Sequence, residues 1–183
     1  MWVKIIILIL GTAGLLWVSR RPLRDVRSHG HSRFFAWEAI LILVVSNLDV
    51  WFKDPWRPAQ IVSWFLMCAS LVPVMWGVRA LRRQGKPGNE RTDSNLIGFE
   101  RTTELVTDGI YRWIRHPLYA SLQALAWGVF FKQPGWAGLC LAGVATLFLW
   151  RTARIEEGEN LRTFGLAYQD YMQRTKMFVP FLW

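Results

Sequence analysis

The sequence contains only two cysteines, Cys68 and Cys140, and both lie inside apolar runs. No CxxC pair and no spacing of Cys and His typical of a zinc site is present, so the sequence predicts neither a disulfide framework nor a metal centre. Both cysteines are interpreted as small buried apolar residues. His29 and His31 flank Gly30 without a nearby acidic partner in sequence, and they are interpreted as part of a basic interfacial loop.

Acidic residues are also few. The chain has 13 Asp and Glu and 22 Lys and Arg, which gives a net charge of +9. A basic excess is common in nucleic-acid-binding proteins, but here the basic residues cluster beside apolar runs rather than along one polar domain. No nucleic-acid partner is therefore expected. Hydrophobic residues make up 52% of the chain, with 12 Trp and only 19% charged residues. This composition is typical of a small membrane protein with several spans and polar ends.

Five apolar stretches are predicted to be helices, because a helix satisfies its own backbone hydrogen bonds in lipid. They are 2–19, 34–51, 59–80, 117–131 and 136–150. The predicted fold class is all-α: a single integral membrane domain over 1–183 with five transmembrane helices and a cytoplasmic helical segment, 151–183. No internal repeat is visible.

Basic residues are concentrated in 20–33, in 79–116 and in the C-terminal segment, whereas the connections 53–57 and 132–135 carry few. By the positive-inside rule, the N-terminus is predicted outside and the C-terminus in the cytoplasm, in an inner or plasma membrane. Segment 81–104 is interpreted as a solvated connection, with a substrate-gating lid as the alternative.

The adjacent turn residues Pro134 and Gly135 predict an antiparallel helical hairpin. His116 lies 18 residues before Pro134, and Thr152 lies 18 residues after it. Because both helices rise ~1.5 Å per residue, these two positions are expected at the same depth. The ionisable residues of this region are then predicted to gather at the inner membrane boundary, where such residues are usually functional. They are Arg115, His116, Glu156 and Glu157, with Tyr119 beside them.

Pro117 is a candidate first residue of a helix, a position where the missing N–H of proline costs nothing. The free N–H groups of that helix end, together with Arg112 and Arg115, form a candidate site for a carboxylate or phosphate.

A stripe at helical spacing follows the hairpin: Glu157, Leu161, Phe164, Tyr168 and Tyr171. It predicts an amphipathic helix packed on the spans or on the membrane, with a lid over a bound cofactor as the alternative. The glycines at 158 and 165 are candidate interruptions of this helix.

RHPLYAS (115–121), the acidic pair EE (156–157), and then Leu161, Phe164, Gly165, Tyr168, Tyr171 and Pro180 together resemble the isoprenylcysteine carboxyl methyltransferase family and the related phospholipid methyltransferases. The resemblance covers the C-terminal part of the chain, and the earlier spans match only in hydropathy. It implies an integral membrane enzyme that uses S-adenosylmethionine at the cytoplasmic end of the last two spans. The cofactor-binding residues are predicted to be Tyr111, Arg115, His116, Pro117, Tyr119, Glu156, Glu157 and Leu161, with Arg115 and Glu157 in the catalytic positions.

The methyl acceptor is expected to be amphiphilic: a carboxylate such as that of an isoprenylcysteine, a phospholipid amine, or a thiol, with membrane lipid around it. Membrane sterol reductases are the first alternative, because they share an R-H-P-x-Y element and use NADPH. Their version carries Asn where this chain has Leu118, which favours methyl transfer. A non-catalytic membrane scaffold, with His116 merely buried, is the second alternative.

Overall fold

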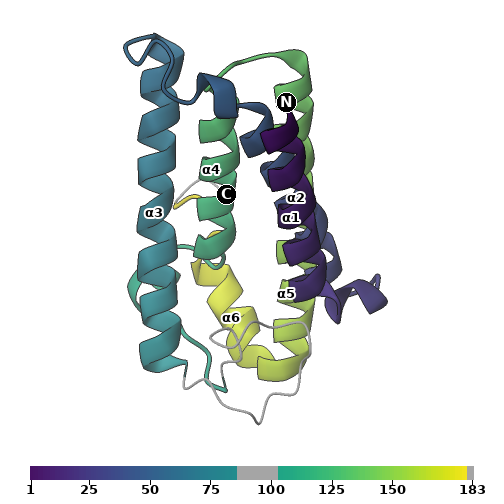
Figure 1. The fold of residues 1–183 in the computed structure, drawn as a ribbon. Coiled ribbons are helices and arrows are strands. Elements are labelled where there is room, and N and C mark those ends of the chain that lie inside the picture. The colour runs from purple at the N-terminus through teal and green to yellow at the C-terminus, as the bar shows by residue number, and fades with distance from the viewer. Residues whose placement is uncertain (86–102, 181–183) are drawn as a thin grey trace.

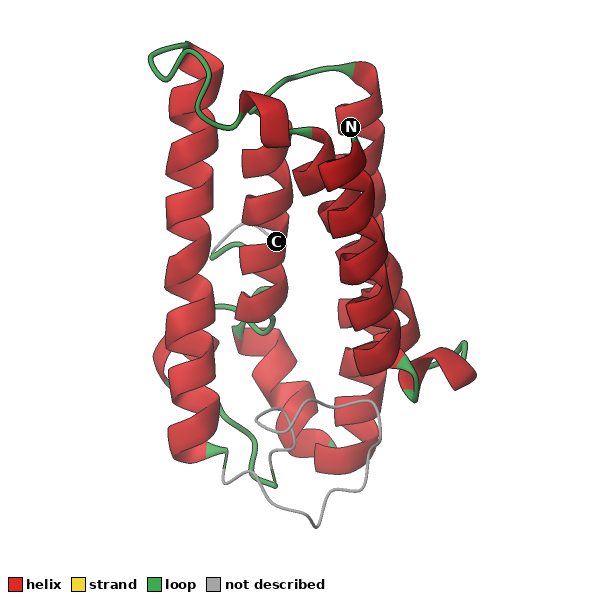
Figure 2. Cartoon of the chain, in the orientation of Figure 1, coloured by secondary structure: helices red, strands yellow, loops and turns green. Residues whose placement is uncertain are grey.

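The computed structural model describes residues 1–85 and 103–180, and every regular element in these ranges is helical (Figure 2). The α-helices are α1 (Trp2–Ser19), α2 (His29–Ser46), α3 (Pro58–Gln84), α4 (Pro117–Phe130), α5 (Trp136–Phe164) and α6 (Leu166–Arg174). Three short 3-10 turns are interspersed: η1 (Pro22–Arg24), η2 (Leu48–Val50) and η4 (Gly109–Arg112).

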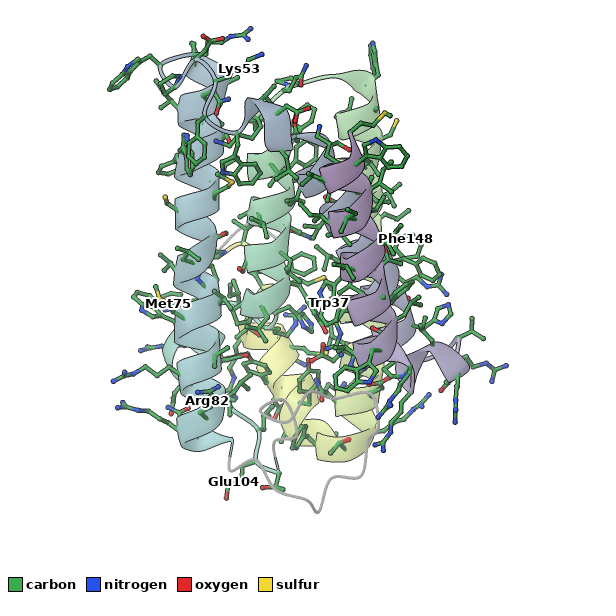
Figure 3. All side chains as sticks on the ribbon, in the orientation of Figure 1. Trp37, Lys53, Met75, Arg82, Glu104 and Phe148 are labelled. Carbon is green, nitrogen blue, oxygen red and sulfur yellow. The ribbon has the colours of Figure 1, made fainter. Side chains whose placement is uncertain are left out.

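The long helices form an upright bundle in which α3 packs against α4 and α2 packs against α5, with α1 on the outer side of α2 (Figure 1). The helices α4 and α5 form the predicted antiparallel hairpin. The short helix α6 folds back beneath α4, at one end of the bundle. Arg82 and Glu104 lie at this end, which we call the α6 end, and Lys53 lies at the opposite end (Figure 3).

Three helices, α1, α3 and α5, are long and apolar enough to cross a membrane. Their outward apolar side chains are exposed in the isolated chain, as is typical of surfaces that face lipid. The helix α4 has 14 residues and covers only ~21 Å, less than a hydrocarbon core of ~30 Å. The count of five spans, which needs α2 and α4 as well, stays a prediction.

The helix α2 begins five residues before the predicted stretch, because the Ser28 hydroxyl caps it by accepting from the His31 N–H at 3.2 Å. Glu38 therefore lies in the middle of α2. The Thr12 hydroxyl donates to its carboxylate at 2.6 Å, which ties α1 to α2. Such an interhelical hydrogen bond offsets the cost of a polar side chain at this depth.

Two further expectations need correction. Cys68 and Cys140 are exposed on the outer faces of α3 and α5 instead of buried, because the small residues of the interior positions are Ala, Gly and Ser. The predicted connection 81–104 begins inside α3, which continues to Gln84. The remainder of that connection, 86–102, lies outside the described residues.

Gly128 lies where α4 packs tightly against α3. A Cβ atom at this position would stand 2.8 Å from Met67 Cγ and 3.2 Å from the Ser63 carbonyl oxygen. Since the carbonyl is part of α3, we expect Gly128→Ala to push the helices apart and destabilise the protein by about 1–3 kcal/mol. Thermal unfolding in detergent measures the change. Gly143→Ala, on a helix face with open space, is the control and should be neutral or stabilising; equal effects of both substitutions would contradict the close contact.

Candidate functional site

The start of α4 is held by the chain segment that follows α6. Ile114 and Lys176 form a parallel bridge, and the Arg115 N–H donates to the Lys176 carbonyl at 2.8 Å. The next residue, His116, donates its N–H to the Met177 carbonyl at 3.1 Å. Pro117 then begins the helix without losing a donor. These backbone bonds fix the positions from which Arg115 and His116 project.

The Arg115 side chain joins α5 to the end of α6. Its Nε donates to Glu157 Oε1 at 2.7 Å, and its NH1 donates to the carbonyls of Met172, at 3.2 Å, and Thr175. The side chain of Glu157 is only 3% exposed. A buried carboxylate needs such a partner, so this pair is part of the structure that supports the site.

His116, Tyr119 and Glu156 form the polar centre of the site. The Tyr119 hydroxyl donates to Glu156 Oε2 at 2.6 Å, and His116 Nδ1 lies 3.9 Å from the same oxygen. The other ring nitrogen, Nε2, lies 3.5 Å from Glu157 Oε1 but makes no hydrogen bond within the described residues, although it is buried. The sequence prediction that the hairpin brings His116 to the two acids is thereby confirmed.

A cavity that is partly open to the outside lies beside this centre. Its wall is formed by α3, the segment before α4, and the helices α4, α5 and α6. The lining residues are Leu81, Leu105, Val106, Tyr111, Arg115, His116, Pro117, Leu118, Tyr119, Glu156, Asn160, Phe164, Tyr168 and Tyr171. The lining is thus largely apolar and aromatic, and Arg115, His116, Glu156 and Asn160 add polar groups to it.

Six of the eight residues predicted to bind a cofactor line this cavity: Tyr111, Arg115, His116, Pro117, Tyr119 and Glu156. Glu157 lies behind them against Arg115. Leu161 is 37% exposed and is not among the lining residues. Asn160 also lines the cavity and was not predicted, although it lies four residues after Glu156 and therefore on the same helix face.

The predicted stripe is divided between two helices. The helix α5 continues through Gly158 and ends at Phe164, and the next residue, Gly165, has a φ of +58° that is readily adopted only by glycine. Beyond it, α6 brings Tyr168 and Tyr171 against the cavity. Burial raises the pKa of both phenols above the usual range, and the charge of Glu156 raises that of Tyr168 further. Both side chains therefore remain neutral hydrogen-bonding groups.

Arg112 does not share the cavity with Arg115. Its guanidinium lies over the exposed Trp113 ring, 5.7 Å from the centroid. It lines a separate hollow on the other side of α6. The anion site predicted from Arg112, Arg115 and the start of α4 is therefore not assembled as one site. Within the described residues, no group of three or more His, Cys, Asp or Glu is arranged to hold a metal ion.

Sequence reasoning also missed the role of His29, which is buried rather than part of an interfacial loop. Its Nδ1 lies 2.5 Å from Glu159 Oε2, joining the start of α2 to α5 across 130 residues of sequence. Burial alone lowers the pKa of this imidazole. The Glu159 hydrogen bond and the charges of Glu156 and Glu159 outweigh burial, so its pKa lies above the ordinary 6.5.

A raised pKa means that the protonated imidazole stabilises the folded state. This contribution is complete below about pH 6.5 and is lost as the pH rises through the raised pKa. We expect His29→Gln to remove this part of the pH dependence of the melting temperature in detergent, with His31→Gln as the control. Parallel pH profiles for wild type and His29→Gln would contradict the assignment.

Comparisons with known proteins identify the family of the chain. The sequence profile of the phospholipid methyltransferase family matches residues 59–175. Methanethiol S-methyltransferase 1 of Bradyrhizobium diazoefficiens is 29% identical over 94 residues, which cover 51% of this chain and 32% of the relative. A probable protein-S-isoprenylcysteine O-methyltransferase of Oryza sativa subsp. indica is 34% identical over 128 residues, or 65% and 63% of the two chains.

The protein-S-isoprenylcysteine O-methyltransferase of Xenopus laevis is 35% identical over 98 residues, which cover 51% of this chain and 30% of the relative. The matched regions thus span between 30% and 63% of the length of these three relatives. No solved structure is significantly similar to the chain.

The apolar helices define the class: an integral membrane protein, here with a cavity at one end of its helical bundle. Within that class, the chain belongs to the phospholipid methyltransferase family, whose profile covers the cavity-lining parts of α3 to α6.

Proposed function

We propose that this protein is an S-adenosylmethionine-dependent methyltransferase that acts at the cytoplasmic membrane face on an amphiphilic acceptor. The observation that carries the proposal is the meeting of His116, Tyr119 and Glu156 at one cavity, because these residues come from two helices and belong to the family-like motifs. The family membership and the names of the relatives support methyl transfer over the NADPH-reductase alternative and over a scaffold.

The donor groups of the cavity fit S-adenosylmethionine. Glu156 offers a carboxylate to an ammonium group or to ribose hydroxyls, and the buried His116 Nε2 has no hydrogen-bond partner in the described chain. Phe164 offers an aromatic face, and Leu118 an apolar side chain, to the adenine base of the cofactor. When bound, the cofactor supplies a methyl group on a positively charged sulfur.

The protein's own residues mainly position the reactants, because in-line methyl transfer depends chiefly on orientation. Glu156 holds the Tyr119 hydroxyl in place, and Arg115 holds Glu157 against the back of the site. The raised pKa values of Tyr168 and Tyr171 keep both phenols protonated. Neither side chain then competes as a phenolate nucleophile with the acceptor.

The charge distribution supports the cytoplasmic assignment of the α6 end. The end of α1, the 3-10 turn η1 and the last two turns of α3 contribute exposed basic residues there: Arg20, Arg21, Arg24, Arg79, Arg82 and Arg83. Only Lys53 and Arg57 are exposed basic residues in the connection between η2 and α3 at the opposite end. By the positive-inside rule, the richer side faces the cytoplasm.

The acceptor is assigned only as a class. The relatives are named for methanethiol and for isoprenylcysteine, so a thiol or a carboxylate on a small or lipid-like molecule is the acceptor we propose. A carboxylate is already nucleophilic, and a thiol becomes so once it has released its proton to solvent, so neither acceptor needs a general base in the protein. The cavity suits such an acceptor, because its polar side chains can orient the reactants and no Ser/His/Asp triad lines it among the described residues.

Ligand-induced stabilisation tests the proposal. A ligand at 100 times its Kd stabilises the folded state by about 2.7 kcal/mol. We expect S-adenosylhomocysteine, and not NADPH, to raise the melting temperature of the detergent-purified protein. Incubation with methyl-labelled S-adenosylmethionine and either a membrane lipid extract or a thiol should then label a product. Stabilisation by NADPH alone, or by neither ligand, would overturn the assignment.

A further inference from the structure

A second hollow lies at the α6 end, on the side of α6 away from the cavity. Three cationic side chains line it: Arg112 from η4, Arg174 from the last turn of α6, and Lys176 from the segment after α6. Asp170 is the only acidic residue among its lining residues. The hollow therefore carries an excess of positive charge, and we call it the basic hollow.

The cations of the basic hollow are exposed, and within the described residues none of the three is in an ion pair with a carboxylate. The backbone of Lys176 is nevertheless fixed by two hydrogen bonds. The Lys176 N–H donates to the Trp113 carbonyl at 3.1 Å, and the Lys176 carbonyl accepts from the Arg115 N–H at 2.8 Å. Two segments some sixty residues apart in sequence are thereby joined, which places the backbone of Lys176 beside the segment that follows Arg112.

The position of the basic hollow indicates which anion it meets. Trp113, on its wall, is 47% exposed and lies beneath the Arg112 guanidinium. An exposed tryptophan beside arginine, at the level where a membrane helix begins, is typical of the headgroup region. The anion most concentrated in that region is the phosphate of an acidic lipid, and guanidinium groups bind phosphate through paired hydrogen bonds.

We propose that the basic hollow binds the headgroup of an anionic phospholipid. The phosphate lies between Arg112, Arg174 and Lys176, and the indole of Trp113 packs against the glycerol and upper acyl region. The site is separate from the cofactor cavity, although Tyr171 lines both. The proposal does not depend on the methyl-transfer reaction.

The test compares two triple variants of the full chain that lose the same charge. One is Arg112→Gln/Arg174→Gln/Lys176→Gln in the basic hollow, and the control is Arg21→Gln/Arg24→Gln/Arg27→Gln, three exposed arginines near η1. Phosphatidylglycerol is added to each purified protein in neutral detergent, and both the melting temperature and the lipid retained in native mass spectrometry are recorded. Phosphatidylcholine and inorganic phosphate are tested in parallel.

We expect phosphatidylglycerol to stabilise the wild type more than phosphatidylcholine does. The half-saturating concentration should rise about tenfold in the hollow variant and less than twofold in the control, because each basic residue near an anionic headgroup adds to binding. Equal losses in both variants would mean only general surface attraction and would overturn the proposal. Equal protection by inorganic phosphate, or by phosphatidylcholine, would also overturn it.

If the triple variant fails to fold, the single variants Arg174→Gln and Lys176→Gln test the proposal instead. Both side chains are exposed, and neither makes a hydrogen bond in the described structure, so these variants should fold. Each should weaken phosphatidylglycerol binding about threefold at low salt, and the difference from wild type should shrink at high salt. Unchanged binding in both would overturn the proposal.

Discussion

Arg115→Met is expected to lower the free energy of unfolding by about 3 kcal/mol, the largest loss of stability that we anticipate for a single substitution in this protein. The substitution leaves the Glu157 carboxylate, only 3% exposed, without its closest cation. It also removes the donor to the Met172 and Thr175 carbonyls, near the end of α6. Buried carbonyls without a partner add to the cost. Denaturation in mixed micelles or thermal unfolding in detergent measures the change.

Two further variants distinguish the effect of losing the buried ion pair on stability from the effect of losing any positive charge. Arg154 also approaches Glu157, at 3.4 Å, but its side chain is 59% exposed, so Arg154→Met should cost no more than about 1 kcal/mol. The double variant Arg115→Met/Glu157→Met should recover part of the lost stability, because it removes the uncompensated buried carboxylate. If Arg115→Met and Arg154→Met cost the same, the buried pair does not have the importance inferred from its geometry.

Glu156→Gln is expected to weaken S-adenosylhomocysteine binding by about tenfold to a hundredfold with little loss of stability. Hydrogen bonds to a charged group contribute ~1.5–3 kcal/mol, and the substitution removes the charge while keeping an acceptor for the Tyr119 hydroxyl. The Glu156 side chain is 24% exposed and lines the cavity. Titration calorimetry of the purified variant measures the change in Kd.

Glu159→Gln is a matched control, because it makes the same chemical change one helical turn further along α5. Its side chain is similarly exposed, at 27%, and it contacts His29 rather than the cavity. We expect it to leave S-adenosylhomocysteine affinity within about twofold while altering the pH dependence of stability. Equal affinity losses for Glu156→Gln and Glu159→Gln would contradict a direct role for Glu156 in binding.

The contrast between Glu156 and Glu157 could not be predicted from sequence. The two acids are adjacent, and adjacent residues on a helix point about 100° apart, so only one of them can face the cavity. Which one does so depends on where Arg115 and α6 lie against α5. Arg115 binds Glu157 and leaves Glu156 to Tyr119 and the cavity. The predicted catalytic pair Arg115 and Glu157 stays a prediction, and its geometry is that of a supporting ion pair.

Leu161 illustrates a second limit of pattern reasoning. Its spacing places it on the same stripe as Phe164 and Tyr168, but the stripe assumes one continuous helix. Gly165 turns the chain, so the tyrosines of α6 approach the cavity from another direction while Leu161 faces outward. His29 could not be assigned at all, because its partner Glu159 is 130 residues away in sequence.

The sequence by itself determined the helices, the hairpin and the meeting of His116 with the two acids. Those features follow from local properties: apolar length, a Pro-Gly turn, a constant helical rise and a proline at the start of α4. Tertiary structure alone decided which acid faces the cavity, which arginine supports it and where the second group of cations gathers. These outcomes depend on how α6 and the segment after it pack back onto α4 and α5, and that packing joins residues whose separation in sequence carries no signal.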